Sequence, residues 1–65
     1  MIVLYSTGCP KCKILKQKLD NKNVEYRECD SVDEMLEIGI TQVPVLSVDG
    51  ELFPFAAAND WINKL

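Results

Sequence analysis

The chain has 65 residues, so we expect residues 1–65 to form a single domain. Hydrophobic residues make up 48% of the sequence, which supports one compact core and excludes an intrinsically disordered chain. The net charge of −3 and the lack of a basic face interleaved with aromatic residues argue against nucleic-acid binding. No apolar run approaches the roughly 20 residues that span a bilayer, and no basic region precedes the short apolar start, so we expect a cytoplasmic protein with no membrane partner.

The first predicted elements are a strand and a helix. Residues 2–5 form a short apolar run that is typical of a buried strand. Ser6-Thr7-Gly8 interrupts the run, and Pro10 fits the first position of a helix because its missing N–H costs nothing there. The pattern predicts a helix that ends at about Asp20. Its expected buried face holds Cys12, Leu15 and Leu19, with Ile14 beside them.

A second strand and a short helix follow. Residues 24–29 begin with alternating apolar and polar side chains, as in a half-buried strand. Ser31 and Glu34 have the spacing of a capping box. In this motif each of the two side chains accepts a hydrogen bond from the backbone N–H of the other residue. We expect the helix that begins there to end near Gly39. Its expected inward side chains are Val32, Met35 and Leu36.

The last part of the chain predicts a hairpin and a helix. Residues 44–48 read as a third strand, and Asp49-Gly50 is a strong signal for a two-residue hairpin turn. Residues 51–53 then return as a fourth strand, and residues 56–65 form a final helix. Its expected inward side chains are Trp61, Ile62 and Leu65. Strands that alternate with helices predict an α/β fold with a four-stranded mixed sheet, flanked by helices, whose first two strands are joined by a crossover.

The most informative motif is Cys9-Pro10-Lys11-Cys12, between the first strand and the first helix. A zinc site needs four ligands, and the chain has no histidine and only one further cysteine, Cys29. Three cysteines also cannot form a closed disulfide framework. The pair is therefore interpreted as a redox dithiol, as a site for Cu(I), or as two structural thiols without a role. We expect no metal site whose ligands all come from this chain. We expect Cys29 to be a small buried side chain.

Redox exchange is the interpretation that the local pattern favours. If Pro10 begins the helix, Cys9 is its N-cap, and the Cys9 sulfur accepts hydrogen bonds from the backbone N–H groups of Lys11 and Cys12. These bonds, the positive end of the helix dipole and the charges of Lys11 and Lys13 stabilise a thiolate. We therefore expect Cys9 to attack a substrate disulfide and Cys12, one turn further in, to resolve the mixed disulfide.

A small Cu(I)-binding chaperone is the alternative. Domains of that class also carry a C-x-x-C between the first strand and the first helix, but they follow a different element order and end on a strand. This chain is predicted to end on a helix. Pro10 also suits a rigid helix start better than a loop that opens around an ion.

The charges are distributed unevenly along the chain. Residues 1–22 carry five lysines and one acid, whereas residues 23–65 carry two basic and nine acidic residues. Lys11 and Lys13 lie within one helical turn of the thiols, so the positive part of the chain surrounds the cysteine pair.

The segment Gly8-Cys9-Pro10-Lys11-Cys12, together with Thr41-Gln42-Val43-Pro44, resembles the glutaredoxin-type members of the thioredoxin superfamily. The resemblance spans the whole chain in element order. It implies a thioredoxin-like fold and an enzyme that exchanges disulfides through Cys9 and Cys12, with no cofactor beyond this dithiol. It also implies a cis peptide bond before Pro44 that leaves the Val43 backbone free to pair with a substrate. Thr41 and Tyr5 complete the expected substrate-binding residues.

Two stretches depart from the glutathione-dependent relatives. Those proteins usually carry a lysine shortly before the first cysteine and a Gly-Gly pair with a following acid after the third strand; residues 5–8 and 49–56 contain neither. Residues 55–65 are similar instead to the ending of small redoxins that donate electrons to ribonucleotide reductase, although Leu52-Phe53-Pro54-Phe55 replaces their Trp-Ser-Gly-Phe segment. We expect the protein to be a monomer. Its expected partners are a disulfide-bearing protein substrate and a reductase, either thioredoxin reductase or the glutathione system.

The aromatic residues near the C-terminus have two expected roles. Phe53 and Phe55 bracket Pro54, and one of them is a candidate contact for a reductase or a substrate. Trp61 is expected to anchor the last helix in the core.

Overall fold

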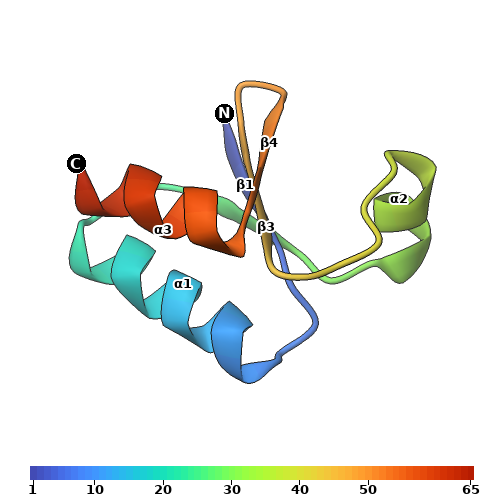
Figure 1. Ribbon diagram of the computed structural model, residues 1–65, viewed down its shortest axis with the longest axis horizontal. Coiled ribbons are helices and arrows are strands. Elements are labelled where there is room, and N and C mark those ends of the chain that lie inside the picture. The colour runs from blue at the N-terminus through green and yellow to red at the C-terminus, as the bar shows by residue number, and fades with distance from the viewer.

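The computed structural model describes residues 1–65, in which helices α1 and α3 cover one face of a sheet and α2 lies on the other (Figure 1). The predicted element order and the four-stranded mixed sheet are confirmed. The elements are β1 (Ile2–Tyr5), α1 (Pro10–Asn21), β2 (Arg27–Cys29), α2 (Val32–Glu37), β3 (Val45–Val48), β4 (Glu51–Pro54) and α3 (Phe55–Asn63).

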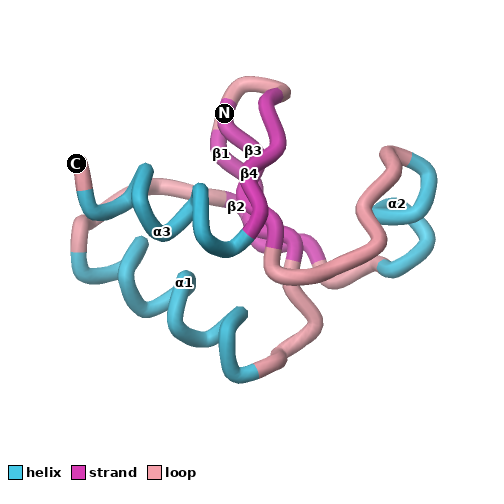
Figure 2. Tube along the Cα trace, in the orientation of Figure 1, coloured by secondary structure: helices cyan, strands magenta, loops and turns pink.

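The strands lie in the order β2-β1-β3-β4. Figure 2 shows them in magenta, with α1 and α3 on one side and α2 on the other. Strand β1 runs parallel to β2 and antiparallel to β3. A parallel pair needs a long crossover connection, which α1 supplies. Because β1 and β3 are antiparallel and Tyr5 lies opposite Val45, the loop that leaves β1 and the loop that enters β3 meet at the same end of the sheet. The cysteine motif lies at this end.

Two apolar clusters pack on the two faces of the sheet. Leu4 and Leu46 lie opposite one another and face α1 and α3, whereas the next pair, Tyr5 and Val45, points to the other face, because side chains alternate along a strand. A register slip of one residue would exchange the two sets. The first cluster consists of Leu4, Leu15, Leu19, Leu46, Ala58 and Ile62, and the second of Met35, Ile40 and Val45.

The predicted hairpin between β3 and β4 is confirmed. Asp49 and Gly50 both have positive φ angles, 50° and 90°, as a two-residue turn of type I′ requires. The Asp49 N–H donates to the carbonyl of Met1 over 3.0 Å, and the Asp49 carboxylate pairs with the N-terminal ammonium group. The turn is thereby tied to the start of β1.

The second strand is shorter than predicted. Strand β2 spans only Arg27–Cys29, so the expected start at residue 24 is wrong. The preceding residues are held by the end of α1 instead: the Val24 N–H donates to the carbonyl of Leu19 over 3.0 Å, and the Tyr26 hydroxyl donates to Asp20 over 3.0 Å. These bonds turn the chain back over the helix before it can pair with β1.

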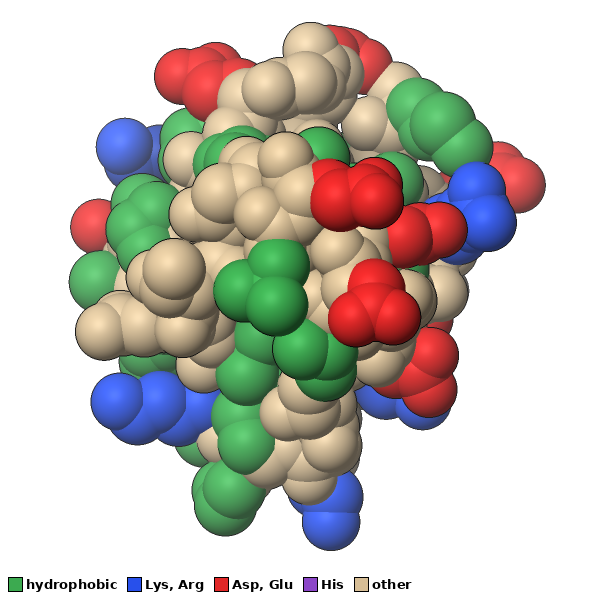
Figure 3. Space-filling model, turned by 90° about the vertical axis from the view of Figure 1, so that its right-hand side faces the viewer, with side chains coloured by type: hydrophobic (Ala, Val, Ile, Leu, Met, Phe, Trp, Pro, Cys, Tyr) green, Lys and Arg blue, Asp and Glu red, His purple; other side chains and the backbone are tan.

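Helix α2 buries less than its sequence predicts. Ser31 caps the helix as expected, because its hydroxyl accepts a hydrogen bond from the Glu34 N–H over 3.4 Å. The second bond of the predicted capping box is absent, and the Glu34 carboxylate accepts from the Cys29 thiol instead. Met35 is buried, but Val32 and Leu36 are 54% and 59% exposed, so their predicted inward positions are wrong. A six-residue helix that stands off the sheet can bury only one side. On this side of the molecule, hydrophobic side chains form a central band beside a group of acidic ones (Figure 3).

Two further predicted core positions are also exposed. Ile14 is 43% exposed, because at 100° per residue it lies on the opposite side of α1 from Cys12 and Leu19. Leu65 is 54% exposed, because α3 ends at Asn63 and the last residue no longer follows the helical phase. Trp61 is partly buried against the first cluster and stacks on Phe53, with ring centroids 6.4 Å apart.

Candidate active site

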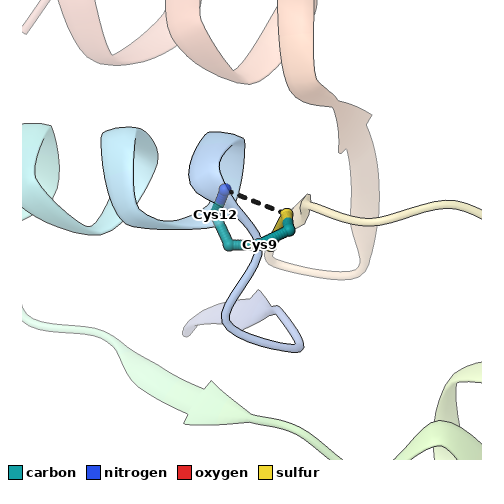
Figure 4. Close-up of a disulfide and its surroundings, with 2 residues drawn as sticks. All are labelled: Cys9 and Cys12. Carbon is teal, nitrogen blue, oxygen red and sulfur yellow. Dashed lines mark hydrogen bonds between the residues drawn. A yellow bond between two sulfur atoms is a disulfide. The ribbon is translucent and has the colours of Figure 1, made fainter.

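Cys9 and Cys12 lie at the start of α1, where their sulfur atoms form a disulfide (Figure 4). Cys9 is the N-cap residue, with an extended backbone, and Pro10 occupies the first helical position. The Cys12 N–H donates to the Cys9 sulfur over 3.2 Å; the second expected bond, from the Lys11 N–H, is absent. The sulfur of Cys9 thus takes the place of the usual capping oxygen and satisfies one free N–H of the first turn.

The two cysteines differ in exposure. The Cys9 side chain is partly exposed, whereas Cys12 is 2% exposed and belongs to the buried face of α1. Their Cα atoms are 5.0 Å apart, within the range that a disulfide spans. An external disulfide can therefore reach Cys9 but not Cys12.

The loop before the motif is held by β2. The Ser6 N–H donates to the carbonyl of Cys29 over 3.0 Å, which adds one bond to the β1–β2 ladder. Gly8 has a φ of +85°, a backbone conformation that residues with a Cβ rarely adopt. This turn brings the chain back so that Cys9 can cap the helix.

Lysines flank the dithiol on both sides. The Lys11 Nζ lies 5.4 Å from the centre of the Phe55 ring, and Lys13 is exposed one residue beyond Cys12. The first turn of α1 contains no acidic residue, and the two ion pairs of the structure, Met1–Asp49 and Lys16–Glu28, involve neither lysine. The electrostatic surroundings of Cys9 therefore favour a thiolate.

The segment that enters β3 lies beside the dithiol. The Val43–Pro44 peptide bond is cis, Pro44 is buried, and Thr41 is exposed in the preceding loop. Tyr5 and Val43 both pack against the second apolar cluster. In Figure 4 the Cys9 sulfur points toward the segment that leads into β3. The structure thus brings Tyr5, Val43 and Pro44 to the end of the sheet that holds the cysteines.

The backbone of Val43 has no partner within the chain. Its N–H and C=O lie outside every helix and strand and take part in none of the remaining backbone hydrogen bonds. No side chain bonds to them either. A donor and an acceptor are therefore available at the edge of the site, where Val43 is only partly buried.

Comparison with known proteins assigns the chain to a family. The family model described as Glutaredoxin matches residues 2–53. The chain belongs to the glutaredoxin family. Its α/β fold is therefore thioredoxin-like, and the expectation of a glutaredoxin-like small redoxin is confirmed. A close cysteine pair in this family supports a redox role.

Two curated relatives agree with this assignment. The chain is 35% identical over 57 residues to a protein described as thioredoxin from Methanothermobacter thermautotrophicus, a match that covers 78% of this chain and 74% of the relative. It is also 35% identical over 60 residues to an uncharacterized glutaredoxin-like 8.6 kDa protein in the rubredoxin operon of Clostridium pasteurianum, covering 80% of each.

The protein has a polar pocket of about 470 Å³ on the other flank of the dithiol. Cys12 is among the residues that line it, whereas Cys9 is not. The pocket separates α1 from the loop between β2 and α2. It is lined by Ser6, Thr7, Gly8, Cys12, Lys13, Lys16, Glu28, Asp30 and Val32. Sequence reasoning did not find this pocket, because its walls come from segments that only the fold brings together.

Cys29 is not the small buried side chain that the sequence predicted. It is partly exposed at the end of β2, and its thiol donates to the Glu34 carboxylate over 3.1 Å. The backbone of Ser31 lowers the pKa of the Cys29 thiol, but the hydrogen bond to Glu34, partial burial and the charge of Glu34 together raise it above the ordinary value. The bond between Cys29 and Glu34 connects the end of β2 to α2.

Two features are absent from the structure. No three side chains among His, Cys, Asp and Glu are grouped so that they could hold a metal ion. None of the helices has the length and hydrophobicity needed to cross a membrane.

Proposed function

We propose that this protein is a dithiol–disulfide oxidoreductase that reduces disulfides of proteins or small molecules. The observation that carries the proposal is the pairing of a partly exposed Cys9, which caps α1 through its sulfur, with a buried Cys12 behind it. Stabilisation of a thiolate by the helix start makes Cys9 the attacking sulfur, and burial makes Cys12 the resolving one.

The reaction has two exchange steps. The Cys9 thiolate attacks one sulfur of the substrate disulfide, so that the substrate S–S bond breaks, a Cys9–substrate bond forms, and one substrate thiolate leaves and takes up a proton. The Cys12 thiol then loses its proton and attacks the Cys9 sulfur, which releases the second substrate thiolate. The substrate gains two electrons and two protons, and the protein ends with the Cys9–Cys12 disulfide. No bound cofactor is needed for these steps.

The substrate-binding role falls to the segment beside Cys9. The unpaired N–H and C=O of Val43 suit an extended peptide that adds one short rung of strand pairing next to the dithiol. Pro44 holds this backbone in place, while Tyr5 and Thr41 border the site. Pro10 gives the helix a rigid start, and Lys11 adds positive charge beside the reacting sulfur atoms.

We further propose that the electron donor is thioredoxin reductase and that ribonucleotide reductase is a candidate acceptor. The support is the absence of the lysine and the Gly-Gly-acid segment that hold glutathione in glutathione-dependent relatives, together with the similarity of residues 55–65 to the ending of the ribonucleotide-reductase redoxins. The proposed location is the cytoplasm, where both partners would be found.

The test is a turnover assay that follows NADPH consumption on one disulfide substrate. One arm supplies thioredoxin reductase, and the other supplies glutathione with glutathione reductase. Turnover in the first arm alone supports the proposed donor, whereas turnover in the second alone contradicts it. Cys9→Ser should abolish turnover, and Cys29→Ser is the matched control because it removes a thiol outside the pair. No turnover in either arm, with tight Cu(I) binding, would favour the metal-chaperone function instead.

A further inference from the structure

Lys11 is held at a defined place beside the dithiol by an aromatic ring. Its Nζ lies 5.4 Å from the centre of the Phe55 ring, a distance at which an ammonium group is attracted to the ring face. Lys11 belongs to the first turn of α1, and Phe55 is the first residue of α3. The contact therefore joins the cysteine motif to a segment more than forty residues away in the sequence.

Lys11 lies on the flank of the dithiol where the Val43–Pro44 segment is found. Phe55 directly follows Pro54, and Pro54 is paired opposite Val45, the residue after Pro44. The Phe55 ring is thus at the end of the sheet where β3 begins. Lys13, in contrast, lines the pocket on the opposite flank. Lys11 is therefore the cation beside the proposed substrate segment.

The charge of Lys11 is not neutralised within the chain. Lys11 takes part in neither of the two ion pairs, and an aromatic ring fixes an ammonium group without cancelling its charge. A negatively charged group would find an uncompensated cation there.

We infer that Lys11, held on the Phe55 ring, makes the protein prefer disulfides that carry an Asp or Glu next to the attacked cysteine. The inference rests on the proposed function and adds the class of substrate. A lysine that is already positioned loses less side-chain freedom when it meets a carboxylate, so its contact with the substrate is stronger than that of a mobile surface lysine. Because the site is open to solvent, salt should weaken the preference.

The test measures single-turnover reduction of three peptides by the fully reduced protein. The peptides share one intramolecular disulfide and differ only in having Asp, Asn or Lys beside the attacked cysteine. The second-order rate constant is read from acid-quenched samples by chromatography. Ratios between peptides are used because the thiolate fraction of Cys9 is the same for all of them and cancels. At low ionic strength we expect the Asp peptide to react about three to ten times faster than the Lys peptide, and high salt to bring the ratio toward one.

Three variants assign the preference to one residue. Lys11→Gln should lower the ratio below about two. Lys22→Gln removes the same charge from the far end of the same helix and should keep the wild-type ratio. Phe55→Leu keeps an apolar side chain at the start of α3 but removes the ring, and it should lower the ratio in part. Thermal unfolding of each variant shows whether it is folded, and Lys11→Gln changes only an exposed side chain.

Each other outcome overturns a stated part of the inference. A ratio of one in the wild type, or a wild-type ratio in Lys11→Gln, overturns the role of Lys11. An equal loss in Lys22→Gln would mean that overall charge, not a held lysine, sets the preference. A full ratio in Phe55→Leu overturns the role of the ring. If no peptide is reduced at all, the proposed function fails and the inference falls with it, whereas reduction without preference contradicts the inference alone.

Discussion

The backbone N–H of Cys12 donates a hydrogen bond to the sulfur of Cys9 over 3.2 Å. The residue proposed to resolve the mixed disulfide therefore also stabilises the attacking sulfur, and it does so through an atom that does not depend on its side chain. Replacement of the Cys12 side chain should consequently separate the two roles.

Cys12→Ser should trap a mixed disulfide. The variant keeps the N–H that stabilises the Cys9 thiolate, so the first exchange step proceeds, but no sulfur is present for the second. Intact mass measured without reductant should show the protein plus one substrate chain. Cys9→Ser is the control and should show no adduct. An adduct that forms in Cys9→Ser would instead make Cys12 the attacking residue.

Leu46→Ala should cost about 2–5 kcal/mol of unfolding free energy. Leu46 is fully buried and lies opposite Leu4 in the cluster between the sheet and helices α1 and α3. Urea unfolding of the oxidised protein measures the change. Leu52→Ala on the neighbouring strand is the matched control, since Leu52 is 42% exposed, and should change the free energy by less than about 1 kcal/mol. Similar losses at both sites would contradict this description of the core.

Gly50→Ala should destabilise the protein by about 1 kcal/mol through the backbone alone. Gly50 has a φ of +90°, and a Cβ added there would meet no atom within 4 Å, so the loss comes from the conformation and not from a clash. Gly50→Asn provides the control, because asparagine adopts positive φ more readily and should lose less. Urea unfolding distinguishes the two, and equal losses would show that conformation is not the cause.

Tyr26 should make stability fall at high pH. Burial, the hydrogen bond to the Asp20 carboxylate over 3.0 Å, and the charges of Asp20 and Glu28 raise the pKa of Tyr26 to about 12 from its ordinary 10.0. Between these values the unfolded chain releases a proton that the folded protein keeps, so the contribution is complete below pH 10 and is lost as the pH rises to about 12.

Urea unfolding across this pH range, in a Cys29→Ser background, measures the effect of Tyr26. The background removes the Cys29 thiol, whose pKa is also raised above its ordinary value and which would add its own loss. Tyr26→Phe should have a flatter profile because it has no proton to release. A profile for Tyr26→Phe as steep as that of its parent would mean that other groups cause the decline.

Features that depend on neighbouring residues were predictable from the sequence. Pro10 placed the start of α1 and made Cys9 its N-cap, Ser31 capped α2, and Asp49-Gly50 formed the hairpin turn. Each of these features depends on a backbone preference or a hydrogen bond within a few residues. The burial of α2 was predicted wrongly, because periodicity shows which side chains share a face but not whether the rest of the fold covers that face.

The sequence by itself determined the element order, the cysteine motif at a helix start and the resemblance that led to the glutaredoxin family, since all of these are patterns along the chain. Only the tertiary structure decided that Val43 keeps an unpaired N–H and C=O, that Lys11 rests on the Phe55 ring, and that Cys29 bonds to Glu34. Those contacts depend on how the sheet brings together the ends of β1, β3 and β4, and packing between segments distant in the sequence sets that arrangement.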